Sequence, residues 1–268
     1  MPNTFPSLFL SHGAPNMALQ DTPVRQFMSG LGDMYQKPDA VVSISAHFET
    51  KGVAVVSDSN PEMIYDFRGF EPELYEMQYP APGQPKLAAE VVDLLRESGL
   101  PVEDIGKRGF DHGTWVPLSL IWPDADIPIV QVSIDPDEAP EYHYRIGQAL
   151  SSLPQRNIAV VGSGSITHNL PAIFAQDRTP EYTAKVKGWM EGFLSWFDSQ
   201  LESGNTGNLL KYREKAPFFA ENHPTDEHML PIFVAMGAAG SKWNARKIHQ
   251  SVTYDFLAMD AWEFSSAS

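Results

Sequence analysis

The sequence predicts an α/β fold in which a central, mostly parallel or mixed sheet is flanked by helices. Short apolar runs typical of buried strands alternate with segments whose apolar residues recur at helical spacing. The expected strands cover residues 7–10, 40–45, 127–134 and 158–161, and the expected helices cover residues 85–97, 139–153, 181–201 and 230–239. Because 268 residues suit one α/β core, we expect a single domain over residues 1–268.

The composition is that of a globular protein, with 43% hydrophobic and 20% charged residues. A formal net charge of -15 would repel phosphate backbones, so we expect no nucleic-acid partner. No apolar run approaches the ~20 residues that cross a bilayer, so we expect no membrane association. The absence of cysteine excludes disulfides and thiolate metal ligands. Since the N-terminus lacks the pattern of a secretory signal, we expect the cytoplasm.

Three histidines follow expected strands directly. His12 follows residues 7–10, His47 follows residues 40–45, and His168 comes soon after residues 158–161. In open α/β sheets the loops beyond the strand ends converge at one edge, so these side chains can meet there. Neutral imidazole binds Fe, Zn, Cu and Ni. The pattern therefore indicates a transition-metal site at the sheet edge, assembled from dispersed loops.

A polar segment near the C-terminus carries two more histidines. Within Glu221-Asn222-His223-Pro224-Thr225-Asp226-Glu227-His228, two histidines and three carboxylates could supply a ligand, a residue that supports a ligand, and an acid. The alternative is a polar turn in which Thr225 or Asp226 caps a helix that begins near Met229.

His112 lies between Asp111 and Gly113. Asp111 could orient the imidazole or cap the turn that follows. A ring that exchanges its proton near neutral pH suits general acid–base chemistry, so His112 is a catalytic candidate. For His143 and His249 we expect structural roles.

Five motifs, in this order, resemble those of the class III extradiol ring-cleaving dioxygenases, and in particular of the 4,5-DOPA dioxygenase branch. The resemblance extends from about residue 5 to residue 264. The motifs are Ser11-His12-Gly13, Ser45-Ala46-His47-Phe48-Glu49, Asp111-His112-Gly113-Thr114-Trp115-Val116-Pro117-Leu118, the segment 162–169, and Asn222-His223-Pro224.

This resemblance implies one divalent metal at the sheet edge. Carried over by position, it makes His12, His47 and His223 metal ligands. His168 would be a fourth ligand or the acid–base residue, and His112 would line the substrate side. Residues adjacent to these positions would support the ligands from a second layer: Glu49, Asn169 and Asp111.

The Pro-rich and aromatic stretch 61–85 is expected to be a surface excursion that either covers the site or simply packs. It resembles the same branch, but Arg68 and Glu71 depart from the commoner Tyr and Pro. These departures put the substrate's identity in question more than the reaction. The residues expected to contact substrate are Tyr65, Phe67, Arg68 and His228.

The resemblance implies ring opening of a DOPA-like catechol by O2 to a semialdehyde, with Fe(2+) as the active metal. Zn(2+) would fill the same site during purification. A carboxylate on the substrate could meet Arg68, Lys107, Arg108 or Lys215.

Several alternatives stay open. Many extradiol enzymes use two histidines and a carboxylate, and Glu221, Asp226 and Glu227 keep that ligand set available. The chain could also be a zinc hydrolase, because zinc binds three histidines and a water molecule, or a metal-binding or signalling relative without turnover. The retained His112 and His168 favour catalysis. Whether the chain forms a homo-oligomer is left open.

Overall fold

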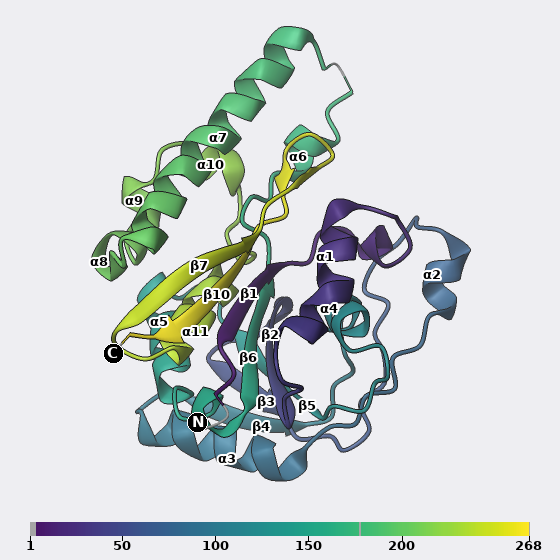
Figure 1. The fold of residues 1–268 in the computed structure, drawn as a ribbon, viewed down its shortest axis with the longest axis vertical. Coiled ribbons are helices and arrows are strands. Elements are labelled where there is room, and N and C mark those ends of the chain that lie inside the picture. The colour runs from purple at the N-terminus through teal and green to yellow at the C-terminus, as the bar shows by residue number, and fades with distance from the viewer. Residues whose placement is uncertain (1–3, 177, 268) are drawn as a thin grey trace.

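The computed structural model describes residues 4–176 and 178–267, and its centre is an eight-stranded sheet (Figure 1). The strand order is β4-β3-β5-β2-β6-β1-β10-β7. Four adjacent central strands run parallel: β5 (Ile129–Ile134), β2 (Ala40–Glu49), β6 (Ile158–Gly164) and β1 (Ser7–Ser11). Their runs of Val and Ile are buried on both faces, as parallel strands require.

The outer strands make the sheet mixed. β3 (Val53–Val56) is antiparallel to β5 and parallel to β4 (Val102–Gly106). On the other side, β10 (Ala261–Ser266) is antiparallel both to β1 and to β7 (Trp243–His249). The predicted α/β class with a mixed, mostly parallel sheet is thus confirmed.

Helices cover both faces of the sheet (Figure 1). Val42 and Val160 belong to the core beneath α11 (Leu230–Ala238) and α5 (Pro140–Ala149), whereas their neighbours Val41 and Val161 belong to the core beneath α1 (Pro23–Leu31) and α4 (His112–Ile121). This alternation follows from the two-residue period of a strand. α3 (Pro85–Glu97) packs against β3 and β4.

The C-terminal half adds a projecting layer. The long helix α7 (Pro180–Glu202) extends beyond the sheet, with short helices beside one half of it (Figure 1). The remaining elements are α8 (Thr206–Leu209), α9 (Tyr212–Lys215), α10 (Phe219–Asn222), α2 (Pro72–Glu76), α6 (Leu170–Ile173), the hairpin β8 (Val252–Thr253) and β9 (Leu257–Ala258), and three 3-10 helices at Pro15–Ala18, Gly32–Met34 and Pro154–Arg156.

Two local expectations need correction. β2 continues to Glu49, because pairing with β5 resumes at Ile134 after an irregularity, so His47 lies within the strand rather than after it. The helix α11 has Met229 at its N-cap without a side-chain bond, so neither Thr225 nor Asp226 caps it. Asp226 instead pairs with Arg213, at 2.6 Å.

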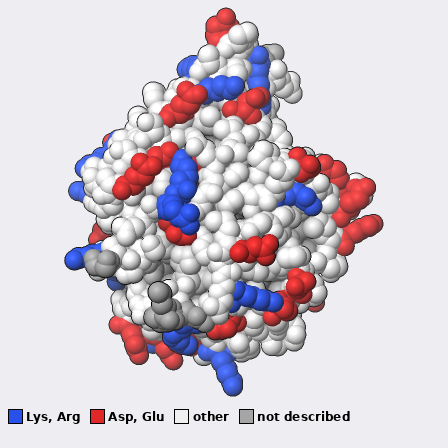
Figure 2. Space-filling view, in the orientation of Figure 1, with Lys and Arg blue, Asp and Glu red and all other residues white. Residues whose placement is uncertain are grey.

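Acidic and basic side chains alternate over the face shown in Figure 2, and acidic ones are densest at the edge where α2 lies. Among the helices of the described ranges, none has the length and apolarity needed to cross a membrane.

Candidate metal centre and active site

Three histidines converge at the carboxyl ends of the parallel strands. The candidate ligand nitrogens of His12, His47 and His228 all lie within 4.8 Å of one another. His12 follows β1, His47 belongs to β2, and His228 lies just before α11. The Nε2 atoms of His12 and His47 are 3.1 Å apart. We call these three residues the histidine cluster.

Hydrogen bonds orient two of the three rings. The hydroxyl of Ser163 donates to the carbonyl of Gly113, so its oxygen accepts the Nδ1–H of His12, at 3.0 Å. The carboxylate of Glu227 accepts the Nδ1–H of His228, at 2.7 Å. Because each Nδ1 carries the proton, each Nε2 presents its lone pair to the cluster.

The cluster has the geometry and the charge state of a metal site. Two nitrogens that each lie about 2.1 Å from one ion, at an angle of roughly 90–110°, are about 3.0–3.4 Å apart, which matches the separation of His12 and His47. Burial, and then the neighbouring histidines, lower the pKa of His12 and His228 well below the usual value. Burial, followed by His112, lowers the pKa of His47 to about 3. The rings are therefore neutral, which is the form that binds Fe or Zn.

Hydrogen bonds to the backbone of His47 fix its position. Its carbonyl accepts from the Arg108 guanidinium at 3.1 Å, and its N–H donates to Ser45 Oγ at 3.1 Å. Asp111 joins these partners, because it accepts from Ser45 at 2.6 Å and pairs with Arg108 at 2.8 Å. Asp111 also caps α4 through the N–H of Thr114. Of the two roles considered for Asp111, the structure shows the cap.

Two glycines permit the close packing around the cluster. A Cβ on Gly113 would lie 2.4 Å from Ser45 Oγ and 3.0 Å from the His47 ring. A Cβ on Gly164 would lie 2.1 Å from the carbonyl oxygen of His228. Any larger residue at either position would therefore displace a cluster histidine or its support.

His168 faces the cluster without joining it. Its ring stacks on that of His228, with 3.6 Å between centroids, and its Nδ1 lies 3.8 Å from Glu227 Oε1. Burial lowers the pKa of His168, so its ring is neutral and can accept a proton.

His112 approaches from the start of α4. Its Nδ1 lies 3.0 Å from Asp66 Oδ1, and the same carboxylate oxygen accepts the His112 backbone N–H at 3.0 Å. The ring centroid is 4.0 Å from that of His47. Asp66, rather than Asp111, is the carboxylate that contacts this imidazole. Asp66 was not among the residues expected at the site, since the sequence of its loop gives no signal of where the loop folds.

The structure does not bring His223 to the cluster. Its Nε2 donates to the carbonyl of Ile166 at 2.9 Å, and its ring is buried beside Phe193 and Phe219. Burial lowers the pKa of His223 to about 4. From this segment the structure thus brings His228, which had been expected to contact substrate, and not His223, to His12 and His47.

The other residues that were expected at the site fall into two groups, those that line the cavity and those that do not. Phe67 and Arg68 line the cavity described below, whereas Tyr65 donates its hydroxyl to the Met77 carbonyl and packs within its loop. Asn169 caps α6 and donates to the Glu221 carbonyl, and Glu49 is exposed. In the described chain neither of these two hydrogen-bonds to a cluster histidine.

A cavity of about 730 Å³ opens beside the cluster, a size suited to a substituted aromatic ligand. His12, His47, His112, His168 and His228 line one side. The rest of the lining comes mainly from loops, α6 and β9. It includes two charged residues, Arg68 and Glu71, and is otherwise largely apolar: Phe67, Phe70, Leu170, Ile173, Phe174 and Leu257.

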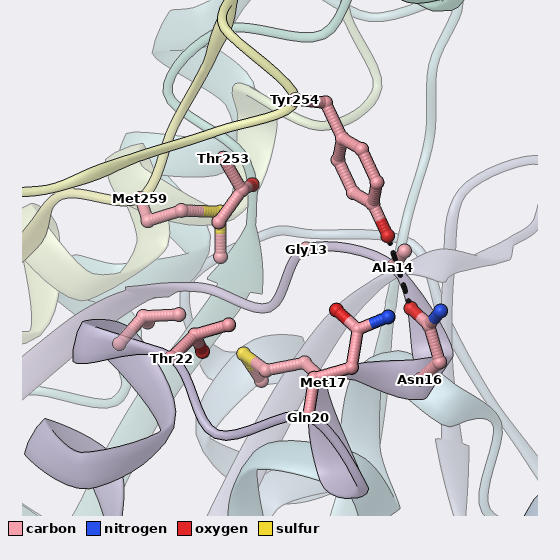
Figure 3. Close-up of a pocket in the computed structure, with 10 residues that line it drawn as sticks. Gly13, Ala14, Asn16, Met17, Gln20, Thr22, Thr253, Tyr254 and Met259 are labelled. Carbon is pink, nitrogen blue, oxygen red and sulfur yellow. Dashed lines mark hydrogen bonds between the residues drawn. The ribbon is translucent and has the colours of Figure 1, made fainter.

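The β8–β9 turn borders the cavity. Tyr254 points towards Ala14, and its hydroxyl donates to Asn16 Oδ1 at 3.2 Å; Figure 3 shows this contact in a smaller pocket next to the cavity. Tyr254 and Asp255 both have positive φ angles, 51° and 67°, so this turn holds strained backbone next to the site.

The comparisons with known proteins agree with the geometry. Residues 7–259 match the family described as the catalytic LigB subunit of aromatic ring-opening dioxygenase. A 4,5-DOPA dioxygenase extradiol from Beta vulgaris is 41% identical over 265 residues, which cover 97% of this chain and 96% of the relative. The protein of the same name from Escherichia coli K12 is 36% identical over 236 residues, which cover 87% of this chain and 84% of that relative.

A solved structure shares the whole fold. The crystal structure of an uncharacterized protein from Escherichia coli K12 aligns with a TM-score of 0.74 and 30% identity, over 97% of this chain and 99% of the other. The chain therefore belongs to the LigB family of extradiol, aromatic ring-opening dioxygenases, which confirms the family that the sequence motifs indicated.

Proposed function

We propose that this enzyme opens the ring of a DOPA-like catechol with O2, beside the two hydroxyls, and that His12, His47 and His228 hold its single divalent metal. The observation that carries this proposal is the convergence of three neutral imidazoles, two of them with Nε2 left free by a hydrogen bond at Nδ1. The relatives named 4,5-DOPA dioxygenase extradiol support the substrate class.

Bound Fe(2+) would supply open positions for catechol and O2 and would acidify the catechol hydroxyls, whereas Zn(2+) would occupy the same nitrogens without this redox chemistry. The carboxylate of Glu227 supports the three proposed ligands, since its hydrogen bond with Nδ1 orients the ring of His228.

His168 is the proposed acid–base residue. It lines the cavity, lies against a proposed ligand, and has a lowered pKa, so it can accept the proton that a catechol loses on binding. It can return that proton later in the reaction. His112, held by Asp66, would orient the substrate from the opposite side of the cluster.

The test is reconstitution of metal-free protein under anaerobic conditions with Fe(2+) or, separately, Zn(2+). DOPA and simpler catechols are then added while oxygen uptake and the visible spectrum are followed. We expect oxygen uptake and a yellow semialdehyde with iron alone. Stoichiometric metal binding without oxygen uptake would overturn the proposal and would favour a zinc hydrolase or a binding protein.

We further propose that the enzyme acts in the cytoplasm.

A further inference from the structure

Arg68 occupies an unusual place in the cavity. It follows Phe67, whose buried ring meets His112 edge-on at 5.9 Å, and it precedes Gly69, whose φ of +77° turns the loop. Both Phe67 and Arg68 line the cavity, and Arg68 is exposed. A ligand that rests against Phe67 would therefore have a guanidinium beside it.

The other candidate cations are engaged or placed elsewhere. Arg108 pairs with Asp111 and donates to the carbonyl of His47, so it supports the cluster. Lys215 bonds to Asn208, and neither it nor Lys107 lines the cavity. Across the described ranges, Arg68 is the one Lys or Arg that lines this cavity, and it makes no hydrogen bond or ion pair there.

The carboxylates around the cavity disfavour an anionic ligand. Asp66 and Glu227 lie beside the histidines, and Glu71 lines the cavity in the same loop as Arg68, so each would repel an anionic group attached to the bound ring. The net charge of -15 also opposes long-range attraction of anions. A negative substituent is therefore favoured only where it contacts Arg68 directly, across the apolar wall of Phe67 and Phe70.

We propose that Arg68 selects catechols whose ring substituent ends in a carboxylate, which its planar guanidinium binds through two parallel hydrogen bonds. This inference rests on the proposed function, because it assumes that the catechol hydroxyls face the histidine cluster. Arg68 is then a specificity-determining residue, and the histidines carry the chemistry.

The test compares two catechols that differ by the carboxylate: 3-(3,4-dihydroxyphenyl)propionate and 4-ethylcatechol. With iron-loaded wild type we expect a higher kcat/KM for the acid. Arg68→Gln should lower kcat/KM for the acid about tenfold and leave 4-ethylcatechol within about twofold, the size expected for one partly exposed charge-assisted contact. Arg68→Lys should lose less than Arg68→Gln, because it keeps the positive charge. It should not match wild type, because an ammonium group lacks the planar pair of donors that fits a carboxylate. Lys107→Gln, outside the cavity, is the matched control and should change neither value.

Binding of both catechols to zinc-loaded protein, measured by calorimetry, gives a readout that does not need turnover. The same tenfold loss for the acid alone in Arg68→Gln supports the inference even if no oxygen is consumed, in which case only the proposed function fails. Equal values for the two catechols in wild type, or equal losses for both in Arg68→Gln, would overturn the inference while ring cleavage stands.

Discussion

The two sides of the cavity are built differently. On the strand side, His12 and His228 are buried and His47 is half-buried, and hydrogen bonds with Ser163, Glu227 and Arg108 fix their rings or backbone. On the loop side, Phe174 is 71% exposed and Leu170 is 43% exposed. Arg68 and Glu71 also belong to this side.

This difference separates reaction from substrate choice. Ligand geometry must be held within a fraction of an ångström, which residues in or packed against the strands achieve and exposed loops do not. Loops in turn tolerate changes of side chain, so the departures at Arg68 and Glu71 leave the cluster intact. The variants below test the strand side, which we expect to be far less tolerant.

The largest effect is expected from His228→Ala. It removes one Nε2 from the cluster, so bound metal should be lost and kcat/KM should fall by more than about 10³-fold. The matched variant His223→Ala should keep stoichiometric metal and lose about 1–3 kcal/mol of stability, because the Ile166 carbonyl is left without its donor. Metal analysis, oxygen uptake and urea unfolding measure these effects. Metal loss in His223→Ala alone would reverse the ligand assignment.

His168→Gln should keep the metal and lose turnover. Removal of a general acid–base group costs roughly 10²- to 10⁴-fold in kcat. The metal content should match wild type because we assign the metal to His12, His47 and His228, although a ligand atom of His168 also lies within 4.8 Å of those of Glu227 and His228. His249→Gln, whose ring stacks on Phe27 away from the cavity, is the control. If the metal is lost together with activity, His168 is a fourth ligand.

A smaller effect is expected from Ser163→Ala. Without its hydroxyl, the His12 Nδ1–H loses its acceptor, and affinity for the metal should fall about 10- to 100-fold. Competition with a chelator measures this affinity. Ser43→Ala removes a buried hydroxyl that bonds to Thr114 and should leave the affinity unchanged. An unchanged affinity in Ser163→Ala would show that packing alone orients His12.

The smallest effect on turnover is expected from Asp260→Asn. This substitution should instead change the free energy of unfolding and its dependence on pH. Burial raises the pKa of Asp260 to about 6 despite its 2.6 Å bond with Lys247, which Asp198 shares. Since the folded state holds a proton that the unfolded state releases, this group's contribution favours folding near pH 4 and declines as the pH rises to 6.

That decline amounts to at most about 3 kcal/mol. Urea unfolding of wild type and Asp260→Asn between pH 4 and 7 measures it: the variant should gain stability relative to wild type across this window and no further above pH 6. A constant difference at every pH would show that Asp260 is ionised throughout.

Hydrophobic periodicity predicted much of the fold. The expected helix over residues 85–97 has those bounds in the structure, and the four expected strands are the parallel centre of the sheet. The outer strands β3, β4, β7 and β10 were harder: β4 is half-exposed, and its residues show little alternation. Pairing with distant segments, rather than local pattern, makes them strands.

The fold class, the family and the set of histidines could all be predicted from the sequence, because they depend on local hydrophobic pattern and on motifs that stand in order along the chain. The motifs led us to expect His223 as the ligand and His228 as a substrate contact, although both lie in one polar segment. Only tertiary packing separates them: Ile166 and two phenylalanines enclose His223, while the close approach of Gly164 sets His228 beside His12 and His47. Which nitrogens converge depends on contacts between strands far apart in sequence, and such contacts have no local signature.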